Sequence, residues 1–248
     1  MSTVYILWLR QLKRYFRSKS RIVGSLGQPL LFLLALGYGL GPVFQKAGEG
    51  RYIDFLAPGI ISMSILFTAI FTGIEMIWDR QFGFLKETMV APVPRFYIML
   101  GRTLGGATVA TLQGVIVFII AMIAGFKPEN IFLIPFALVV MFLIAVLFTA
   151  IGTAIASLLD DMQGFQLIVN FLIMPIFFLS GSLFPLEGLP NFVTLIAKID
   201  PLSYGVDALR YFLTGVSHFG IVTDLTILTA LIIAVISVGS YLFSKIEA

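Results

Sequence analysis

The chain has 248 residues, of which 59% are hydrophobic and only 12% are charged, and its mean hydropathy is +1.03. A water-soluble domain carries about a quarter charged residues, so this composition excludes an ordinary soluble protein. The sequence contains no cysteine, which excludes disulfides, thiol nucleophiles and cysteine metal sites. Charges lie between apolar runs about 20 residues long, a pattern typical of an all-α polytopic membrane protein.

The first 21 residues are basic and amphipathic, and no small-residue cleavage site of a signal peptide follows them. One predicted helix face is apolar and carries Tyr5, Trp8, Leu9, Leu12 and Phe16. The opposite face carries Arg10, Lys13, Arg14 and Arg17. This pattern predicts an interfacial helix, with its apolar face in the acyl boundary and its cations toward the headgroups. Such a helix either anchors the first span or binds a partner, and charge alone does not separate these roles.

Residues 22–248 form the predicted membrane domain, with six apolar segments long enough to cross a hydrocarbon core about 30 Å thick. The predicted spans are 22–43, 56–78, 103–125, 131–158, 165–184 and 221–243.

Few polar side chains are expected inside these spans. Glu75 is the only acid that we expect within a span. It is either part of a proton or cation relay, or a carboxylate that reaches headgroup water or pairs with Arg80. The amides of Gln28, Gln113 and Asn170 are predicted to form hydrogen bonds between helices, with contact to a substrate as the alternative.

Lysine and arginine predict the orientation. With both termini in the cytoplasm, eleven of the sixteen cationic residues fall on the cytoplasmic side. These are Arg10, Lys13, Arg14, Arg17, Lys19, Arg21, Arg80, Lys86, Arg95, Arg102 and Lys245. The positive-inside rule therefore favours cytoplasmic N- and C-termini.

The longest polar interruption runs from Trp78 to Arg102 and contains six of the 29 charged residues. Helical spacing places one apolar stripe at Phe82, Leu85 and Met89. The opposite face carries Arg80, Phe84 and Glu87. Because Pro92 and Pro94 stop a helix, we predict a short cytoplasmic helix with an exposed aromatic, Phe84, suited to docking a partner.

Residues 185–220 predict two short amphipathic helices at the outer side, separated at Asp200-Pro201. Asp207 and Arg210 are three residues apart and could pair on the polar face of the second helix. The pair of helices could be re-entrant, could lie flat as a lid, or could form an ordinary interfacial loop.

The chain has no recognisable energy source of its own. It lacks any Gly-Lys dipeptide and therefore the phosphate-binding loop of nucleotide hydrolases. His218 is the only histidine and has no partner in a hydrolytic arrangement. A transporter of this kind would need another subunit, which would bind the predicted helix at Arg80–Met89.

Four segments carry a family resemblance over about residues 5–245. They are FLAPGIISMSILFTAIFTGIEMIWDRQFGFLKETMVAPVPR, LGRTLGGATVATLQG, LFTAIGTAIASL and PIFFLSGSLFPLEGLP with DPLSYGVDALR. In this order they resemble the permease subunits of type-2 ABC exporters, especially the branch similar to daunorubicin and other antibiotic-resistance exporters.

The resemblance implies a six-span permease that forms a homodimer, or a dimer with a paralogue, in a prokaryotic plasma membrane. Two copies of an ATP-binding subunit would carry ATP and magnesium, so this chain would hold no cofactor and would not bind nucleic acid. The interfacial helix with Trp8, Arg10, Lys13, Arg14 and Arg17 would be the connecting helix.

The same resemblance assigns roles to two further segments. The coupling helix, which would fit a groove on the ATPase, would include Arg80, Phe82, Phe84, Leu85, Lys86 and Glu87. The outer re-entrant segment would include Pro185, Pro190, Pro201, Tyr204, Asp207 and Arg210.

The expected substrate is a hydrophobic or amphipathic compound, such as a drug or antibiotic, a lipid or a lipid-linked glycan. Two other function classes remain open from the residues themselves. One is a stand-alone channel or facilitator without an ATPase. The other is an intramembrane enzyme, which the lack of a paired nucleophile and base or of a metal set disfavours.

Overall fold

The computed structural model describes residues 2–46, 51–84, 93–159 and 161–244, and the described chain is helical without a strand. Its elements are α1 (Ser2–Arg17), α2 (Lys19–Gly39), α3 (Gly41–Lys46), α4 (Tyr52–Gln81), α6 (Arg95–Ile123), η1 (Ile131–Leu133), α7 (Ile134–Ser157), α8 (Met162–Leu179), α9 (Asn191–Ile199), α10 (Pro201–Thr214) and α11 (Ile221–Ser244).

Six helical segments of the described chain are long and apolar enough to cross a membrane, which confirms the six predicted spans. They are α2, α4, α6, η1 with α7, α8 and α11. The helices α4 and α6 are longer than predicted, because each continues through charged residues at which the apolar run stops. Arg102, for example, was placed before a span but lies two turns inside α6.

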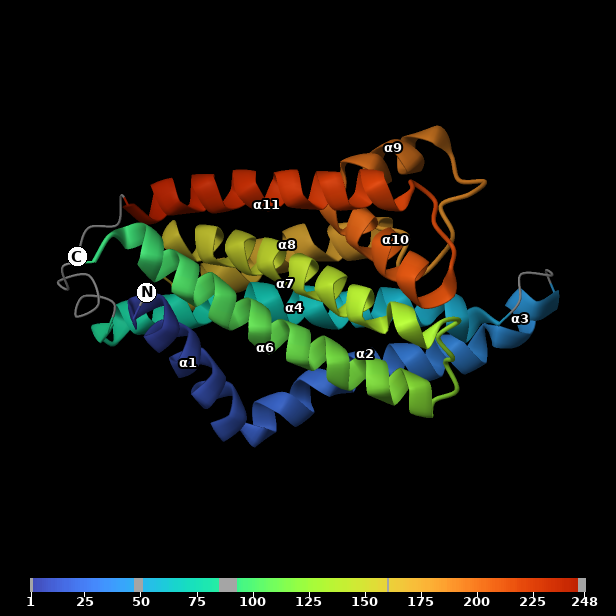
Figure 1. Cartoon of the computed structure of the whole chain (residues 1–248), viewed down its shortest axis with the longest axis horizontal. Helices are drawn as coiled ribbons and strands as arrows, with labels where there is room; N and C mark the ends of the chain where they lie inside the picture. Colours follow the sequence, from blue (N-terminus) through green and yellow to red (C-terminus); the bar gives the residue numbers. More distant parts are fainter. Residues whose placement is uncertain (1, 47–50, 85–92, 160, 245–248) are drawn as a thin grey trace.

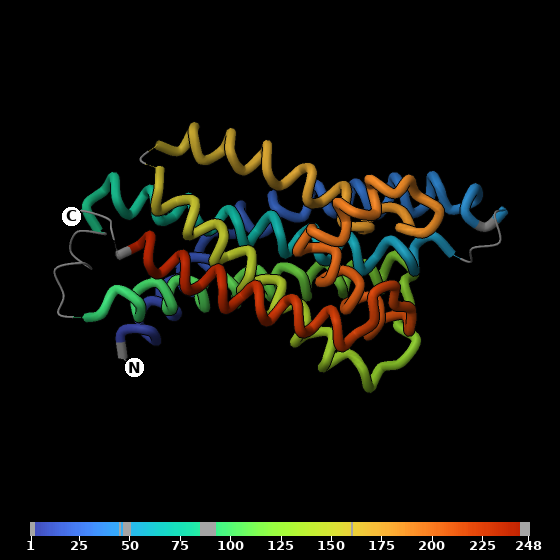
Figure 2. Tube along the Cα trace, turned by 90° about the horizontal axis from the view of Figure 1, so that it is seen from above, coloured from blue at the N-terminus to red at the C-terminus, as the bar shows by residue number. Residues whose placement is uncertain are grey.

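The spans alternate in direction along one elongated bundle (Figure 1). The start of α1 and the end of α11 lie at the same end of the bundle, together with the end of α4 and the start of α6. We call this the terminal end. The short helices α3, α9 and α10 lie at the opposite end, which we call the α10 end (Figure 2).

Helix α4 is the centre of the bundle. Of its most apolar 18 residues, 78% are buried, against 17% for α2, 22% for α8 and 11% for α11. It packs most extensively on α7 and α6, and also on α2 and α10. The peripheral helices α2, α8 and α11 therefore present most of their apolar side chains outward, as membrane-exposed or partner-facing helices do.

Two glycines allow α4 and α7 to approach closely. A Cβ atom added at Gly152 of α7 would lie 2.6 Å from the carbonyl oxygen of Ile70 in α4. A Cβ added at Gly73 of α4 would lie 2.5 Å from the carbonyl oxygen of Gly152. Both distances are far below van der Waals contact, so backbone packing at this crossing requires glycine on each helix.

The structure predicts that Gly152→Ala destabilises the protein by about 1–3 kcal/mol, because the new methyl group forces two packed backbones apart. Thermal unfolding of the purified protein in detergent measures the effect. Gly27→Ala in α2 is the matched control, since nothing lies within 4 Å of its added Cβ. Equal melting temperatures for the two variants would contradict the close-crossing interpretation.

Candidate functional site

A buried ion-pair network joins three helices at the terminal end. Asp79, near the end of α4, is 5% exposed and accepts two hydrogen bonds from Arg10 of α1, at 3.0 and 2.7 Å. Its Oδ2 also accepts a hydrogen bond from Arg102 of α6, which is 4% exposed. One carboxylate thus fixes α1 and α6 to α4, in the charge-assisted geometry that gives strong hydrogen bonds.

Glu75, one turn earlier in α4, extends this network. It is 3% exposed, pairs with Arg21 at the start of α2, and lies 3.7 Å from Arg14 of α1. Arg14 is also 3.9 Å from Asp79, so it bridges the two acids. We name Glu75, Asp79, Arg10, Arg14, Arg21 and Arg102 the charged junction. Glu75 is therefore a structural ion-pair partner of arginines that the sequence placed outside the spans.

The structure corrects the expectation that Glu75 is the only acid within a span. Asp54 and Asp79 lie inside α4, near its start and its end. Asp224 lies in the first turn of α11 and is completely buried. All three stand at the edges of apolar runs, where sequence patterns predict that acids reach water.

Helix α1 packs on α6 along a face that differs from the predicted apolar one. Its buried residues are Leu7, Gln11 and Tyr15. The Tyr15 hydroxyl donates to Oε1 of Gln113 at 2.6 Å, which confirms that Gln113 forms an interhelical hydrogen bond. Trp8 Nε1 donates to Thr108 Oγ1 at 3.0 Å. The helix is thus held by specific contacts with α6 as well as by its amphipathic character.

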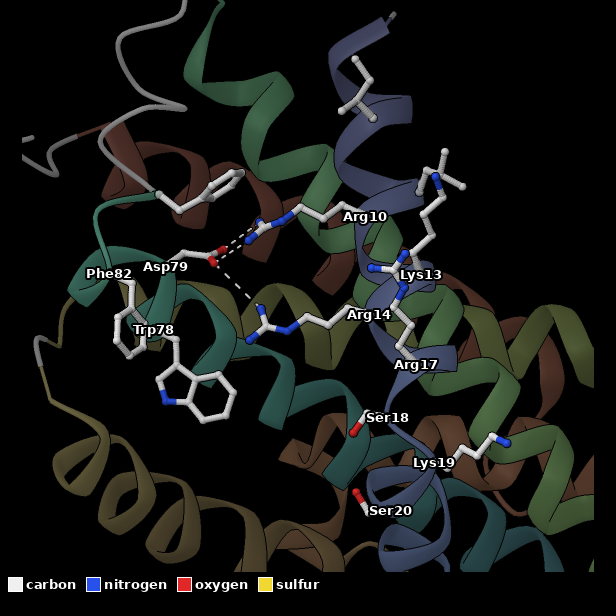
Figure 3. A pocket seen from close by; sticks show the side chains of 13 residues that line it. Arg10, Lys13, Arg14, Arg17, Ser18, Lys19, Ser20, Trp78, Asp79 and Phe82 are labelled. Carbon is white, nitrogen blue, oxygen red and sulfur yellow. Dashed lines mark hydrogen bonds and ion pairs between the residues drawn. The ribbon is translucent and has the colours of Figure 1, made fainter.

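The cationic face of α1 is divided between two environments. Arg10 and Arg14 point to the acids of α4 rather than to headgroups, which corrects the prediction for these two residues (Figure 3). Lys13 and Arg17 are exposed, as predicted. Sequence spacing could not separate the two pairs, because the carboxylates that select Arg10 and Arg14 are distant in sequence; Asp79 lies 69 residues after Arg10.

The chain leaves α4 through a glycine turn. Phe82 caps α4, and Gly83 has φ of +80°, a left-handed conformation that ends a helix. Phe82 is 82% exposed, whereas Phe84 is half-buried beneath Arg10, whose guanidinium carbon lies 3.6 Å from its ring centroid. This reverses the predicted exposure of the two aromatics, because the turn at Gly83 interrupts the helix that the periodicity assumed.

The other residues of the predicted coupling helix divide at this turn. Arg80 lies in the last turn of α4. Leu85, Lys86, Glu87 and Met89 lie outside the described residues.

A broad cleft of about 1060 Å³ lies between α1, the start of α2 and the end of α4 (Figure 3). Its lining includes five cationic side chains and one carboxylate, Asp79. The cationic residues are Arg10, Lys13, Arg14, Arg17 and Lys19. Exposed apolar residues line the same cleft, with Trp78 and Phe82 contributed by the end of α4.

A second, narrower cavity of about 390 Å³ lies between α2 and α4, next to the charged junction. Tyr15, Arg21 and Gln28 border it on one side, and Ser64 and Thr68 of α4 on the other. Gln28 is exposed, so it lines this cavity instead of the packed interior. Asn170 lies on α8, where its Oδ1 accepts only a long 3.5 Å contact from Gln166 of the same helix.

Phenylalanines connect the three helices beside this cavity. The ring centroid of Phe177 in α8 lies 6.2 Å from that of Phe32 in α2 and 6.4 Å from that of Phe67 in α4. Phe71 continues the cluster along α4, 6.4 Å from Phe67. The α2–α4–α8 face is thus apolar and aromatic, with the hydroxyl groups of Ser64 and Thr68 beside the rings on α4.

At the α10 end, α10 is buried against α4, α7 and α11. Asp207 and Arg210 do not pair as predicted. Asp207 accepts hydrogen bonds from the backbone N–H groups of His218 and Phe219, at 2.8 and 2.7 Å. Arg210 donates to the carbonyl oxygen of Gly181 at 2.9 Å and lies 4.1 Å from the ring centroid of Phe55.

The remaining residues of the predicted outer segment shape its turns. Pro190 precedes α9, and Pro201 occupies the first turn of α10, where proline is favoured. The Tyr204 hydroxyl donates to the carbonyl oxygen of Lys198 and so ties α10 to α9. Pro185 borders a small cavity of about 140 Å³ together with Asp207 and Arg210. Helix α10 is thus buried on most of its surface, whereas α9 keeps Phe192, Leu195 and Ile199 exposed.

Asp200 links α9 to α10 and is 6% exposed. Its Oδ1 accepts a hydrogen bond from the backbone N–H of Leu202 at 2.8 Å and so caps α10. Burial raises the pKa of this carboxyl to about 7, although the hydrogen bond from Leu202 opposes the change. The group therefore titrates near neutral pH.

The chain is similar to known membrane transport proteins over most of its length. Residues 2–214 match the family described as the ABC-2 type transporter. The chain belongs to this family. It is 30% identical over 213 residues to Nodulation protein J of Rhizobium leguminosarum bv. trifolii, covering 85% of this chain and 78% of that protein.

Two further relatives agree. The Inner membrane transport permease YadH of Escherichia coli K12 is 25% identical over 230 residues, covering 92% of this chain and 89% of YadH. The Putative transport permease ycf38 of Cyanophora paradoxa is 26% identical over 217 residues, covering 84% of this chain and 73% of that protein. The chain is thus an integral multi-pass ABC-2 transport permease, the membrane component of an ABC transporter.

The charged junction of this permease predicts a large effect of Asp79→Asn. Loss of the carboxylate leaves Arg102 buried without its ion-pair partner, which costs about 3–5 kcal/mol. Thermal unfolding in detergent measures the loss. Asp54→Asn is the matched control, because Asp54 forms a partly exposed pair with Arg51 at 3.5 Å, and such pairs contribute about 1 kcal/mol or less. A similar melting temperature for both variants would refute the structural role of the junction.

Asp200 predicts a pH dependence of stability. Its pKa is raised in the folded state, so the folded protein binds more protons than the unfolded chain between about pH 4 and about pH 7, and stability falls as pH rises through this window. Asp200→Asn keeps a capping oxygen but cannot ionise. We expect its melting temperature to exceed that of the wild type at about pH 8 and to match it at about pH 4 or below. A difference that does not change with pH would rule out this titration.

Proposed function

We propose that this permease is one half of an ATP-driven exporter. Two copies, or one copy and a paralogue, would form the substrate path, and two separate ATP-binding subunits would supply ATP, magnesium and hydrolysis. The terminal end would face the cytoplasm, because the distribution of lysine and arginine along the sequence favours cytoplasmic N- and C-termini, and α1 begins and α11 ends at that end.

The charged junction is the observation that carries the proposal. It lies directly before the stretch that begins at Phe82, and Arg10 contacts both Asp79 of the junction and the ring of Phe84. A force applied to this stretch would therefore act on α1, α4 and α6 together. An ATPase that docks here would move three packed helices as one unit, which is the task of a coupling element.

The uncovered faces of α2 and α8 support a dimeric path. Phe171 and Leu167 of α8 are 85% and 71% exposed, and Leu31 of α2 is 68% exposed. These apolar faces flank the cavity between α2 and α4 and the phenylalanine cluster at Phe177. A second permease packed against them would enclose a path with aromatic walls and few fixed charges.

Such a path fits a hydrophobic or amphipathic substrate. The partly exposed Phe32, Phe67 and Phe71 offer apolar contacts, while Gln28, Ser64 and Thr68 border the cavity and offer hydrogen bonds. Drugs, lipids and lipid-linked glycans all combine these two properties. Closure of the ATPase dimer would rock the two bundles and open the path to the outer side, by alternating access.

Docking at the end of α4 predicts a position-specific loss of complex formation. Phe82→Ala should reduce the affinity for the co-expressed ATP-binding subunit roughly tenfold, because exposed aromatics are frequent anchors at protein interfaces. Co-purification with the ATP-binding subunit and quantitative titration of the two subunits measure this affinity. Phe132→Ala is a matched control, since Phe132 is also 82% exposed but lies at the α10 end.

Equal ATPase binding by the two variants would contradict docking at this end. The decisive functional experiment is reconstitution of both subunits in liposomes, followed by measurement of ATP hydrolysis with candidate amphipathic substrates. Solute flux through the permease alone, without any ATP-binding subunit, would instead identify a stand-alone channel or facilitator.

A further inference from the structure

The basic cleft at the terminal end has a composition that the coupling function does not use. Within the described residues, Lys13, Arg17 and Lys19 line it and form no ion pair, in contrast to Arg10 and Arg14 of the charged junction. All three unpaired side chains are exposed. The single carboxylate of the cleft, Asp79, is already bound by Arg10 and Arg102. The cleft thus presents an excess of positive charge without an acidic partner in the described chain.

Hydrogen-bond donors besides these cations reach the same cleft. Ser18 and Ser20 border it at the point where α1 ends and α2 begins. Ser18 occupies the cap position of α2 but makes no side-chain hydrogen bond to the helix. The N-terminus of this 21-residue helix therefore adds its partial positive charge to that of the three cations. These groups together are suited to a phosphate.

Apolar side chains form the remaining walls. Ile6 and Leu9 of α1 and Trp78 of α4 line the cleft. Ile6 is 61% exposed and Trp78 is 36% exposed, so both offer free apolar surface. Figure 3 shows Trp78 and Phe82 on one side and Lys13, Arg17 and Lys19 on the other. A ligand that fits both sides must carry an anionic head and an apolar body.

The position of the cleft indicates that such a ligand comes from the lipid bilayer. It lies between α1, the start of the candidate span α2 and the end of the candidate span α4, so the ends of two candidate spans border it. Tryptophan and lysine at the ends of spans are typical of the lipid headgroup region. A cleft of about 1060 Å³ is large enough for a headgroup, its glycerol and the upper part of the acyl chains.

We propose that this cleft binds an anionic phospholipid of the surrounding bilayer. The phosphate contacts Lys13, Arg17 and Lys19, and the acyl chains lie along Ile6, Leu9 and Trp78, which leaves Phe82 to the proposed ATPase contact. A bound lipid joins α1 to the end of α4 from outside and reinforces the connection that the charged junction makes from inside. If the terminal end is cytoplasmic, which rests on the proposed function, the lipid comes from the inner leaflet; the binding itself does not depend on that assignment.

Fluorescence quenching tests the site without any transport assay. The chain has two tryptophans, and Trp8→Phe leaves Trp78 in the cleft as the only reporter. The purified full-length variant is titrated in detergent micelles with phosphatidylglycerol or phosphatidylcholine carrying bromine on the acyl chains. We expect phosphatidylglycerol to quench Trp78 at lower mole fractions than phosphatidylcholine. Equal quenching by the two lipids would overturn the proposal.

Charge variants locate the binding. The triple variant Lys13→Gln, Arg17→Gln and Lys19→Gln should reduce the preference for phosphatidylglycerol by about tenfold or more, because each cation near an anionic surface contributes roughly a fivefold factor. The control triple Lys46→Gln, Lys127→Gln and Lys198→Gln removes the same charge from exposed positions at the α10 end and should leave the preference intact. An unchanged preference in the first triple, or an equal loss in both, would refute the site.

Two competitors separate the lipid from other anionic ligands. Excess inorganic phosphate should weaken the quenching only slightly, because it lacks the apolar contacts; complete displacement would assign the cleft to a soluble phosphate and overturn the lipid assignment. Addition of the ATP-binding subunit should leave the preference for phosphatidylglycerol in place. Its disappearance would assign the cleft to protein docking, again against the proposal.

Discussion

Two buried carboxylates near the end of α4 determine how the terminal end of this permease is built. Charged groups removed from water must be paired, since an uncompensated buried charge costs several kcal/mol. Glu75 and Asp79 of α4 are paired with arginines from α1, α2 and α6. These ion pairs therefore join four helices of the bundle. The position of α1 follows from this requirement as much as from its amphipathic pattern.

The bundle has two parts: a firm part, whose helices are joined by many specific contacts, and an uncovered part, whose helices keep apolar faces outward. Helices α1, α4, α6 and α7 are joined by ion pairs, interhelical hydrogen bonds and the close glycine crossing at Gly73 and Gly152. Helices α2 and α8 cover little of the bundle and keep apolar faces outward. In the proposed exporter, the firm part transmits motion from the ATPase, while the uncovered faces meet the second permease and the substrate.

The α10 end is stabilised by different chemistry. Asp207 and Arg210 bind backbone groups rather than each other: Asp207 accepts from N–H groups of the segment before α11, and Arg210 donates to a carbonyl of the segment after α8. Burial lowers the pKa of Arg210 only to about 10, so the side chain stays charged at neutral pH. These contacts hold the two loop segments against α10 and fix the approach to the last span.

The sequence by itself determined the class, the six spans and the position of the polar stretch after α4, because hydrocarbon thickness and helix rise leave few alternatives for long apolar runs. It also indicated that Gln113 forms a hydrogen bond between helices. Only the tertiary structure decided that Arg10 and Arg14 face inward, that Phe82 is exposed instead of Phe84, and that Asp207 and Arg210 do not pair. Periodicity describes one helix at a time, whereas the partner of a charge is chosen by whichever distant helix brings an opposite charge or a free backbone group within reach.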